Sequence, residues 1–119
     1  MNVKQPECWS IDPQARGLRV EMSPSQSIVL PWEHLAFAEF TSEEAEEILT
    51  LSFSTHEFIV HGRMLRRIEA AIQRMELSSI SVVPEKFRSL IGENQPFISS
   101  IEMTMAAPNS EDRTGSDGV

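Results

Sequence analysis

The spacing of apolar residues changes at Gly62, and no other feature of the chain limits its fold as strongly. Over residues 48–60 apolar and polar residues alternate, as they do on strands with one buried face. From Arg63 onward the apolar residues recur every three or four positions, which is the period of an amphipathic helix. The stretch 48–77 is therefore predicted to be a β-hairpin that ends at Gly62 and runs into a helix. The residues expected to face the core from this helix are Leu65, Ile68, Ile72 and Met75, with Met64 and Ala71 beside them.

The register of the hairpin follows from which of its residues must share a face. A turn centred on residues 55–56 places Phe53 opposite Phe58 and Leu51 opposite Val60, so that the apolar faces of the two strands coincide. A four-residue loop around the same centre keeps this register. Cross-strand apolar pairs contribute about 0.2–1 kcal/mol each, so these residues are expected to belong to the core.

The N-terminal half predicts a second hairpin. Residues 18–22 alternate between apolar and charged side chains, and a turn over residues 23–26 separates them from the apolar run 28–30. Pro31 is expected to end the second strand or to place it at a sheet edge, because proline cannot donate to a strand ladder.

Residues 32–51 allow more than one structure. The segment 32–40 is apolar on both faces, which favours a central strand covered on both sides over a short helix. The spacing of Thr41 and Glu44 matches a capping box, which predicts one helical turn after that strand. The alternative is a longer helix that continues through Leu51 and replaces the first strand of the hairpin.

After the main helix, the sequence predicts a strand and a short helix. Residues 78–83 are expected to form the strand, which Pro84 ends. Residues 85–91 are expected to form the helix, with Gly92 as its C-cap. The side chains expected to turn inward from this helix are Phe87, Leu90 and Ile91.

The last strand covers residues 97–105, with a bulge or bend near Ser99 because this serine interrupts the apolar series. Together these patterns predict an α+β fold. It consists of a mostly antiparallel sheet of about six or seven short strands, open or partly rolled, with one principal amphipathic helix packed on one face.

The chain of 119 residues is predicted to contain one domain, over residues 17–105. Residues 1–16 are polar and contain two prolines, so an irregular lead-in is expected. Residues 106–119 are small and polar, which predicts a disordered tail. The net charge of −8 argues against general nucleic-acid binding and against attachment to an anionic membrane, since both need a cationic surface.

The cysteine count and the N-terminal sequence bear on the compartment. Cys8 is the only cysteine, so no disulfide can form within the chain and a reducing compartment is expected. The N-terminus lacks the apolar segment of a signal peptide, and no apolar run has the length of a membrane span. A cytoplasmic protein is therefore predicted.

Residues that often carry catalysis are sparse. His34, His56 and His61 are the only histidines, and the last two point to opposite faces of a regular strand, so they do not suit a metal site. Cys8 lies in the polar lead-in, where no rigid scaffold holds a base beside it. No phosphate-binding glycine loop and no serine-nucleophile motif occurs. The sequence therefore predicts no enzyme, no cofactor and no metal site.

Two groups of charged residues are the better candidates for a site. Four arginines project within about a quarter of the helix circumference, and their guanidinium groups suit carboxylate or phosphate partners. Four glutamates before the hairpin have the complementary charge and can pair with the arginines within one copy or between copies. The alternative is a solvated helix face with internal pairs such as Arg66 with Glu69. The predicted partner-binding residues are Arg63, Arg66, Arg67, Arg74, Glu43, Glu44, Glu46 and Glu47.

These observations lead to three hypotheses of function. The first is a small non-enzymatic interaction module that self-associates as a homo-oligomer or docks on a larger protein through the outer sheet face and the arginines. The second is an accessory domain that binds nucleic acid through the same arginines. The third is a small-ligand carrier with a pocket between helix and sheet. The residues expected to line that pocket are Trp32, Phe37, Phe53 and Met75.

Overall fold

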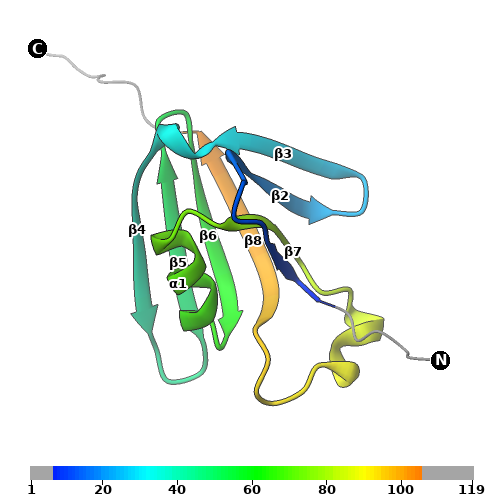
Figure 1. Cartoon of the computed structure of the whole chain (residues 1–119). Helices are drawn as coiled ribbons and strands as arrows, with labels where there is room; N and C mark the ends of the chain where they lie inside the picture. The colour runs from blue at the N-terminus through cyan, green and yellow to red at the C-terminus, as the bar shows by residue number, and fades with distance from the viewer. Residues whose placement is uncertain (1–6, 106–119) are drawn as a thin grey trace, which may run out of the picture.

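The computed structural model describes residues 7–105, which form two four-stranded β-sheets and one α-helix (Figure 1). The first sheet has the order β1 (Trp9–Ile11), β7 (Leu77–Ser81), β2 (Gly17–Ser23) and β3 (Gln26–Pro31). The second has the order β4 (Leu35–Ser42), β5 (Glu47–Phe53), β6 (His56–Arg63) and β8 (Phe97–Met105). The helices are α1 (Arg66–Gln73) and the 3₁₀-helices η1 (Trp32–His34) and η2 (Glu85–Leu90).

The prediction of one sheet of about six or seven strands is wrong, although the combination of strands with one principal helix is confirmed. The chain forms two sheets because Pro31 ends β3 and η1 turns the chain into β4. Trp32 anchors this turn, since its side chain is buried and its indole Nε1 donates to the carbonyl oxygen of Leu77 at 3.1 Å. After α1, β7 returns to the first sheet and pairs in parallel with β2. Local periodicity cannot show a pairing between strands so far apart in sequence.

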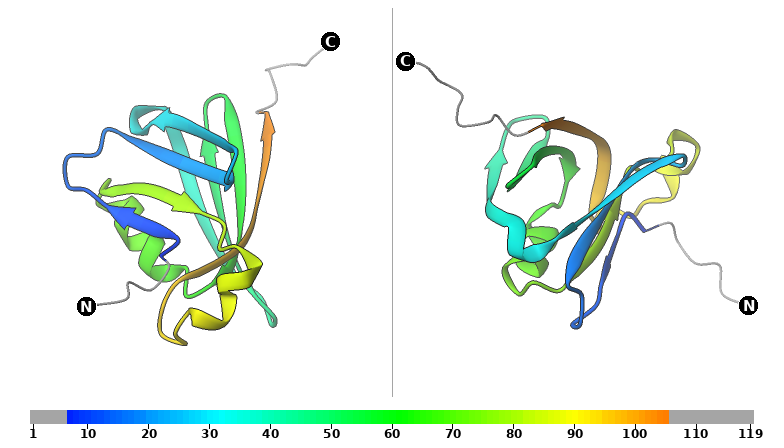
Figure 2. Two further views of the ribbon diagram at one scale, coloured as in Figure 1. Left: turned by 90° about the vertical axis from the view of Figure 1, so that its right-hand side faces the viewer. Right: turned by 90° about the horizontal axis from the view of Figure 1, so that it is seen from above.

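The two sheets enclose the apolar core, and Figures 1 and 2 show the first sheet crossing the second. The helix α1 contacts β4 and β7, one strand from each sheet, and so does not cover the face of a single sheet as predicted. The side chains that are almost completely buried come from both sheets and from the helix segment. The largest of them are Phe53, Phe58, Leu18, Leu49, Leu51, Leu65, Ile68, Leu77, Ile80 and Ile98.

The hairpin of β5 and β6 has the predicted apolar face but not the predicted register. Leu51 lies opposite Phe58, because the turn is centred on residues 54–55 and not on residues 55–56. The shorter connection brings His56 into β6, where its ring stacks on Phe58 with centroids 6.2 Å apart. Phe53 still contacts Phe58 edge-on at 6.0 Å, now as a diagonal neighbour. The expected apolar residues of both strands are all buried: Leu49, Leu51, Phe53, Phe58 and Val60.

Gly62 does not end its strand as predicted, because β6 continues to Arg63. The glycine is required for a different reason. A Cβ atom at this position would lie 1.8 Å from the carbonyl oxygen of Phe97 on the neighbouring strand β8. The bulge predicted near Ser99 is confirmed, since the register of β6 and β8 shifts between His61 and Gly62. The close approach of the two backbones occurs at this shift.

The helix is shorter than predicted and begins at Arg66. Its expected core residues Leu65, Ile68, Ala71 and Ile72 are buried, which confirms most of the predicted apolar stripe. Met64 and Met75 were also expected to face the core, and this was wrong, because their side chains are 36% and 49% exposed. Both methionines have a left-handed backbone, with φ of 60° and 56°, so the chain leaves the helical path at each of them.

The strand predicted between residues 32 and 40 is present from Leu35 as β4, but it is an edge strand and not a central one. A bulge between Leu35 and Phe37 changes which parity faces inward. Phe37 is therefore exposed, whereas Ala38 and Phe40 pack against the core. The apolar pattern on both parities reflects this bulge and not burial on both sides.

The predicted helical turn after β4 does not form, and neither does the longer helix through Leu51. The strand β4 extends to Ser42, and a short loop connects it to β5. In that loop the backbone N–H of Glu43 donates to the carbonyl oxygen of Glu46 at 2.9 Å. The chain therefore makes a hairpin where a capping box was predicted.

The segments near the two ends of the described chain differ in part from the predictions. Trp9–Ile11 forms β1, which the prediction of an irregular lead-in missed. The predicted short helix is present as η2, but Phe87 and Leu90 are exposed and do not turn inward. The strands predicted at residues 18–22, 28–30, 78–83 and 97–105 are confirmed, and they are β2, β3, β7 and β8. The predicted disordered tail, 106–119, lies outside the described residues.

Candidate partner-binding surface

The four predicted arginines do not share one helix face. Arg63 is the last residue of β6, and Arg66 and Arg67 begin α1. Arg74 is the C-cap of the helix and lies at its other end. Arg63, Arg66 and Arg67 are exposed and lie within five consecutive residues, and we call this group the arginine rim.

Each guanidinium group of the arginine rim lies over an aromatic ring that comes from a different strand. Such contacts hold a guanidinium in place by cation–π attraction while its N–H edge stays open to a carboxylate or phosphate. Sequence reasoning missed these rings, because each belongs to a segment distant from the helix. The distances from guanidinium carbon to ring centroid are 4.0 Å for Arg66 over Phe40, 5.4 Å for Arg63 over Phe97 and 5.7 Å for Arg67 over Trp9.

The arginines differ in their polar partners. Arg66 pairs with Glu69 at 3.2 Å, as expected for the i, i+3 spacing, and Arg67 donates to the carbonyl oxygen of Asn94 at 3.2 Å. The Arg66 side chain is 71% exposed, so this ion pair adds little stability. Within residues 7–105, the guanidinium of Arg63 makes no hydrogen bond or ion pair. Its guanidinium is therefore the most available of the rim.

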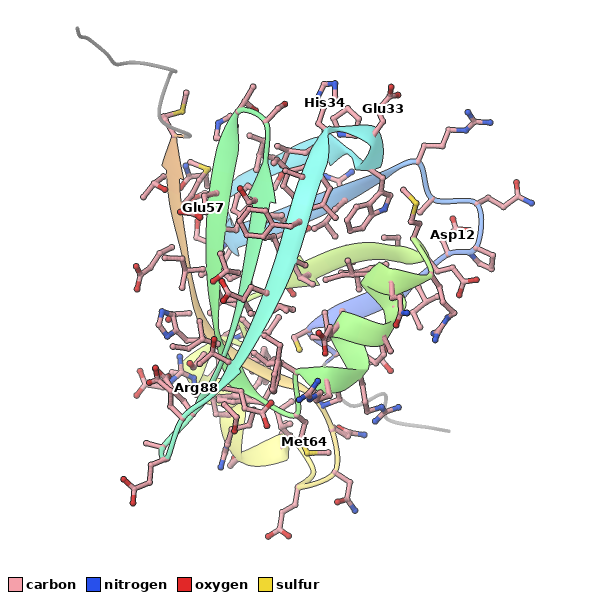
Figure 3. All side chains as sticks on the ribbon, turned by 90° about the vertical axis from the view of Figure 1, so that its left-hand side faces the viewer. Asp12, Glu33, His34, Glu57, Met64 and Arg88 are labelled. Atoms are coloured by element: carbon pink, nitrogen blue, oxygen red, sulfur yellow. The ribbon has the colours of Figure 1, made fainter. Side chains whose placement is uncertain are left out.

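The phenyl ring of Phe97 is within cation–π distance of two arginines. Arg88 also lies over this ring, at 5.7 Å, and donates to the carbonyl oxygens of Val83 and Ser99. These bonds fix Arg88, and Arg88 in turn supports the ring that Arg63 lies over. Figure 3 shows Met64 and Arg88 near the same end of the molecule, far from the labelled His34.

Two hollows flank the arginine rim, and Gln95 lines both of them. The first, of about 440 Å³, lies beside Arg63, and the second, of about 380 Å³, lies beside Arg67. Each combines charged and apolar side chains. The first is lined by Glu47, Arg63, Met64, Ile91, Gly92, Glu93, Gln95 and Phe97, and the second by Glu7, Trp9, Ser10, Ile11, Arg67, Gln95 and Pro96.

The four predicted glutamates split into two pairs with different roles. Glu43 and Glu44 lie exposed in the β4–β5 loop. Glu47 accepts the backbone N–H of Leu65 at 2.8 Å and so caps the N-terminus of α1. Glu46 lies 3.0 Å from His61 and has its charge partly compensated there.

The structure brings the acidic loop and Arg63 to the same end of the molecule without an ion pair between them. A hollow of about 180 Å³ has both Glu46 and Arg63 in its wall. No salt bridge joins the four predicted arginines to the four predicted glutamates within residues 7–105. Arg66 and Arg74 instead pair with Glu69 and Glu76, which are close to them in sequence.

His61 is held by carboxylates on both of its ring nitrogens. Its Nδ1 lies 3.0 Å from Glu46 and its Nε2 lies 3.0 Å from Glu102. The hydrogen bond to Glu46 is the main cause of a raised pKa for His61, and the charge of Glu46 and the contacts with Glu102 add to it. Burial acts in the opposite direction. A neutral imidazole has one N–H, so only the protonated ring can donate to both carboxylates.

The outer face of the second sheet carries both apolar and polar side chains. One row across all four strands is Glu39, Thr50, Ile59 and Glu102. In the next row of this face His61 lies opposite Ile48. This face carries carboxylates, so it resembles the acidic loop in charge and not the arginine rim.

Cys8 is part of the core, which the prediction of an unsupported polar segment missed. Its side chain is 1% exposed and its Sγ donates to the carbonyl oxygen of Pro96 at 3.4 Å. Burial raises the pKa of this thiol to about 11, so it stays protonated near neutral pH. No cluster of three metal-ligating side chains occurs in the part of the chain that the structure describes.

The four residues expected to line a ligand pocket do not come together. Trp32 and Phe53 pack against each other in the core, with ring centroids 6.0 Å apart. Phe37 and Met75 are both about half exposed on the surface. The hollows beside the arginine rim are formed by other residues.

Comparison of the chain with protein-family models, with curated proteins and with solved structures finds no match. Among residues 7–105, no helix has the length and apolar character needed to cross a membrane. Any assignment of function therefore starts from the geometry of the arginine rim and its hollows.

Proposed function

We propose that the protein is a small non-enzymatic interaction module that docks on a protein partner through the arginine rim. The partner presents carboxylates to the rim and apolar side chains to the hollows on either side of it. One observation supports this proposal above all. Arg63, Arg66 and Arg67 each lie over an aromatic ring and are exposed at the surface.

The aromatic contacts matter because they reduce the entropy lost on binding. A free arginine side chain loses rotamer freedom of about 2 kcal/mol when a partner immobilises it. An arginine that already lies over a ring has lost part of this freedom in the unbound protein. Preorganised donors of this kind raise affinity without new contacts.

The net charge of −8 opposes an acidic partner at long range, but it does not decide the contact itself. At physiological ionic strength the field of an exposed charge is screened over about 8 Å. Once it reaches the rim, a carboxylate meets the guanidinium groups of Arg63 and Arg67 beside Glu7, Glu47 and Glu93 in the walls of the hollows. The association rate is expected to be low at low salt, and the partner is expected to contact the rim specifically.

Titration with a glutamate homopeptide, followed by NMR of the labelled protein, tests the proposal. The expected result is a shift of the Trp9 indole and the Arg63 and Arg67 side-chain resonances, which disappears at about 1 M salt. The variant carrying Arg63→Glu and Arg67→Glu is expected to show no shift. A matched control is Arg19→Glu on β2, which changes an exposed arginine outside the rim and should behave as the parent.

Three results would overturn the proposal. The peptide could leave the rim resonances unchanged, or it could shift them equally in the charge-reversed variant. A single-stranded DNA oligonucleotide could also shift the rim where the peptide does not. That last outcome would assign the arginines to phosphate groups and to nucleic acid.

A further inference from the structure

The four edge strands of the two sheets are protected to different degrees. Exposed edges offer unpaired N–H and C=O groups to another strand, and proteins commonly block them with short strands, bulges, prolines or covering elements. The edge β1 has three residues and an irregular register, and β3 ends at Pro31. The edge β4 has a bulge and lies against α1. Each of these three edges carries at least one protective device.

Among residues 7–105, the fourth edge strand, β8, is the longest strand, and no such device from this part of the chain protects its second half. It has nine residues, and its bulge at Ser99 lies near its start. From Ser100 to Met105 it pairs regularly with β6 on one side. Figures 2 and 3 show its other side at the free margin of the second sheet. The segment contains no proline, lysine or arginine, and its one charge, Glu102, is engaged by His61.

The same half of β8 exposes apolar side chains. Ile101 and Met103 are only partly buried, although they pack against the core. Met105, on the same parity, is 71% exposed, the largest fraction among the exposed large apolar side chains of the described residues. An apolar stripe at an open edge is a typical site for the addition of a strand.

We propose that a second copy of the chain adds its β8 to this edge, so that two antiparallel β8 strands join the two four-stranded sheets. Two identical strands can pair in this way around a two-fold axis, which produces a closed dimer and not an open fibre. Sheet parity requires the apolar stripe of one strand to face that of the other. This requirement places the axis at a residue and not between two residues. An axis at Thr104 would pair only residues 103–105 of the described strand, so the central residues considered are Ile101, Glu102 and Met103.

The charge of Glu102 and the existing contacts of residues 97–99 favour Met103 as the central residue. An axis at Glu102 would set this glutamate opposite Glu102 of the partner subunit, and like charges directly opposite are destabilising. An axis at Ile101 would require pairing of residues 97–99, which contain the bulge and where the carbonyl oxygen of Ile98 already accepts the N–H of Val83. With Met103 at the axis, Ile101 covers Met105 of the partner subunit and Glu102 faces the partner's Thr104.

This interface goes beyond the proposed function, because it lies at the far end of β8 from Phe97 and the arginine rim. Charge reversal at Arg63 and Arg67 is expected to leave the dimer intact. Disruption of the β8 pairing is expected to leave the response to the glutamate peptide intact. The two proposals can therefore fail separately.

Cysteine cross-linking of the full chain tests both the dimer and its register. A disulfide requires Cα atoms within about 7 Å. In Met103→Cys the two new cysteines lie opposite each other and are expected to form a covalent dimer on mild oxidation. In Met105→Cys each new cysteine lies opposite Ile101 of the partner subunit. The two cysteines are then about 13 Å apart along the strands, so little cross-linking is expected. Random collision would give the reverse order, because Met105 is the more exposed position.

Sedimentation equilibrium of two variants at one exposed site provides a second test that avoids the core. Thr104→Glu places a glutamate opposite Glu102 of the partner subunit twice per dimer, which should raise the dimer dissociation constant about threefold or more. Thr104→Lys should lower it. Thr41→Glu, on the opposite edge of the same sheet, is the matched control and should leave it unchanged. A chain that is monomeric at every concentration, or equal cross-linking of the two cysteine variants, overturns the proposal.

Discussion

The imidazole Nδ1 of His61 lies 3.0 Å from Oε2 of Glu46, which ties β6 to the loop between β4 and β5. The contact depends on protonation, because the second ring nitrogen is engaged by another carboxylate. The folded-state pKa of His61 is raised above its ordinary value, mainly by the hydrogen bond to Glu46. Protonation of His61 is therefore coupled to folding.

The first prediction concerns the dependence of stability on pH. Since the pKa of His61 is higher in the folded than in the unfolded protein, its contribution is fully present below the unfolded pKa. The contribution is lost as pH rises through the folded pKa. Urea unfolding across this range, compared between the parent and His61→Asn, should show a difference that shrinks with rising pH. A difference that stays constant or grows would contradict the assignment of the raised pKa.

The second prediction concerns the close approach of two backbones at Gly62. A Cβ atom there would meet the carbonyl oxygen of Phe97 at 1.8 Å, and a backbone atom cannot move aside as a side chain can. Gly62→Ala should therefore destabilise the protein by about 3 kcal/mol or more. Gly92→Ala is the matched control, since its Cβ would find its nearest neighbours at 3.8 Å in the side chain of Gln95. Thermal unfolding of both variants measures the difference, and equal melting temperatures would contradict it.

Alternation in the sequence was sufficient to predict which residues of β5 and β6 face the core, because the face depends only on parity. It was not sufficient for the register. Moving the turn from residues 55–56 to residues 54–55 keeps every residue on its face and changes only its cross-strand neighbour. The choice between the two turns depends on contacts such as that of His56 with Phe58, which form only after the strands have met.

Bulges were the main source of other differences between expectation and structure. The interruption of the apolar series at Ser99 was visible in the sequence and predicted its bulge correctly. The bulge in β4 moved the inward face from one parity to the other, so its sequence looked apolar on both sides. The split into two sheets depended on the parallel pairing of β2 with β7, which no local pattern indicates.

The candidate site was predictable as a group of exposed arginines but not as an organised surface. The i, i+3 pair of Arg66 with Glu69 follows from helical spacing alone and is present. The contact of Arg67 with Trp9 depends on β1, which was not predicted, and on its pairing with β7. Geometry of this kind arises from long-range topology, so a single sequence could indicate the arginines but not the rings that hold them.

The third prediction concerns the left-handed residue at the end of α1. Met75 has φ of 56°, and its N–H donates to the carbonyl oxygen of Ile72. The N–H of Glu76 donates to the carbonyl oxygen of Ala71. This is the Schellman arrangement, in which glycine is the preferred residue. Met75→Gly should stabilise the protein by about 1 kcal/mol, because a left-handed backbone costs an L-residue about that much. Its side chain is half exposed, so little packing is lost.

The matched control for this substitution is Gln73→Gly, at the exposed last residue of α1. Glycine there should destabilise the protein by about 1 kcal/mol relative to alanine at the same site. Chemical denaturation of the two variants should therefore show shifts of opposite sign. Destabilisation by both would mean that the Met75 side chain contributes more packing than its exposure indicates.

The fourth prediction concerns the carboxylate that caps α1. The helix lacks a side-chain cap from its own N-cap residue, Leu65, and Glu47 of β5 accepts the N–H of that leucine instead. The carboxylate also lies near the positive end of the helix dipole. Glu47→Ala should therefore destabilise the protein by about 1–2 kcal/mol, and Glu47→Gln, which keeps an acceptor oxygen, by less. Glu44→Ala, in the exposed part of the same acidic run, should change stability by less than about 0.5 kcal/mol. Urea unfolding of the three variants would contradict this role for Glu47 if Glu44→Ala were as destabilising as Glu47→Ala, because the effect would then belong to the charge of the run and not to the hydrogen bond.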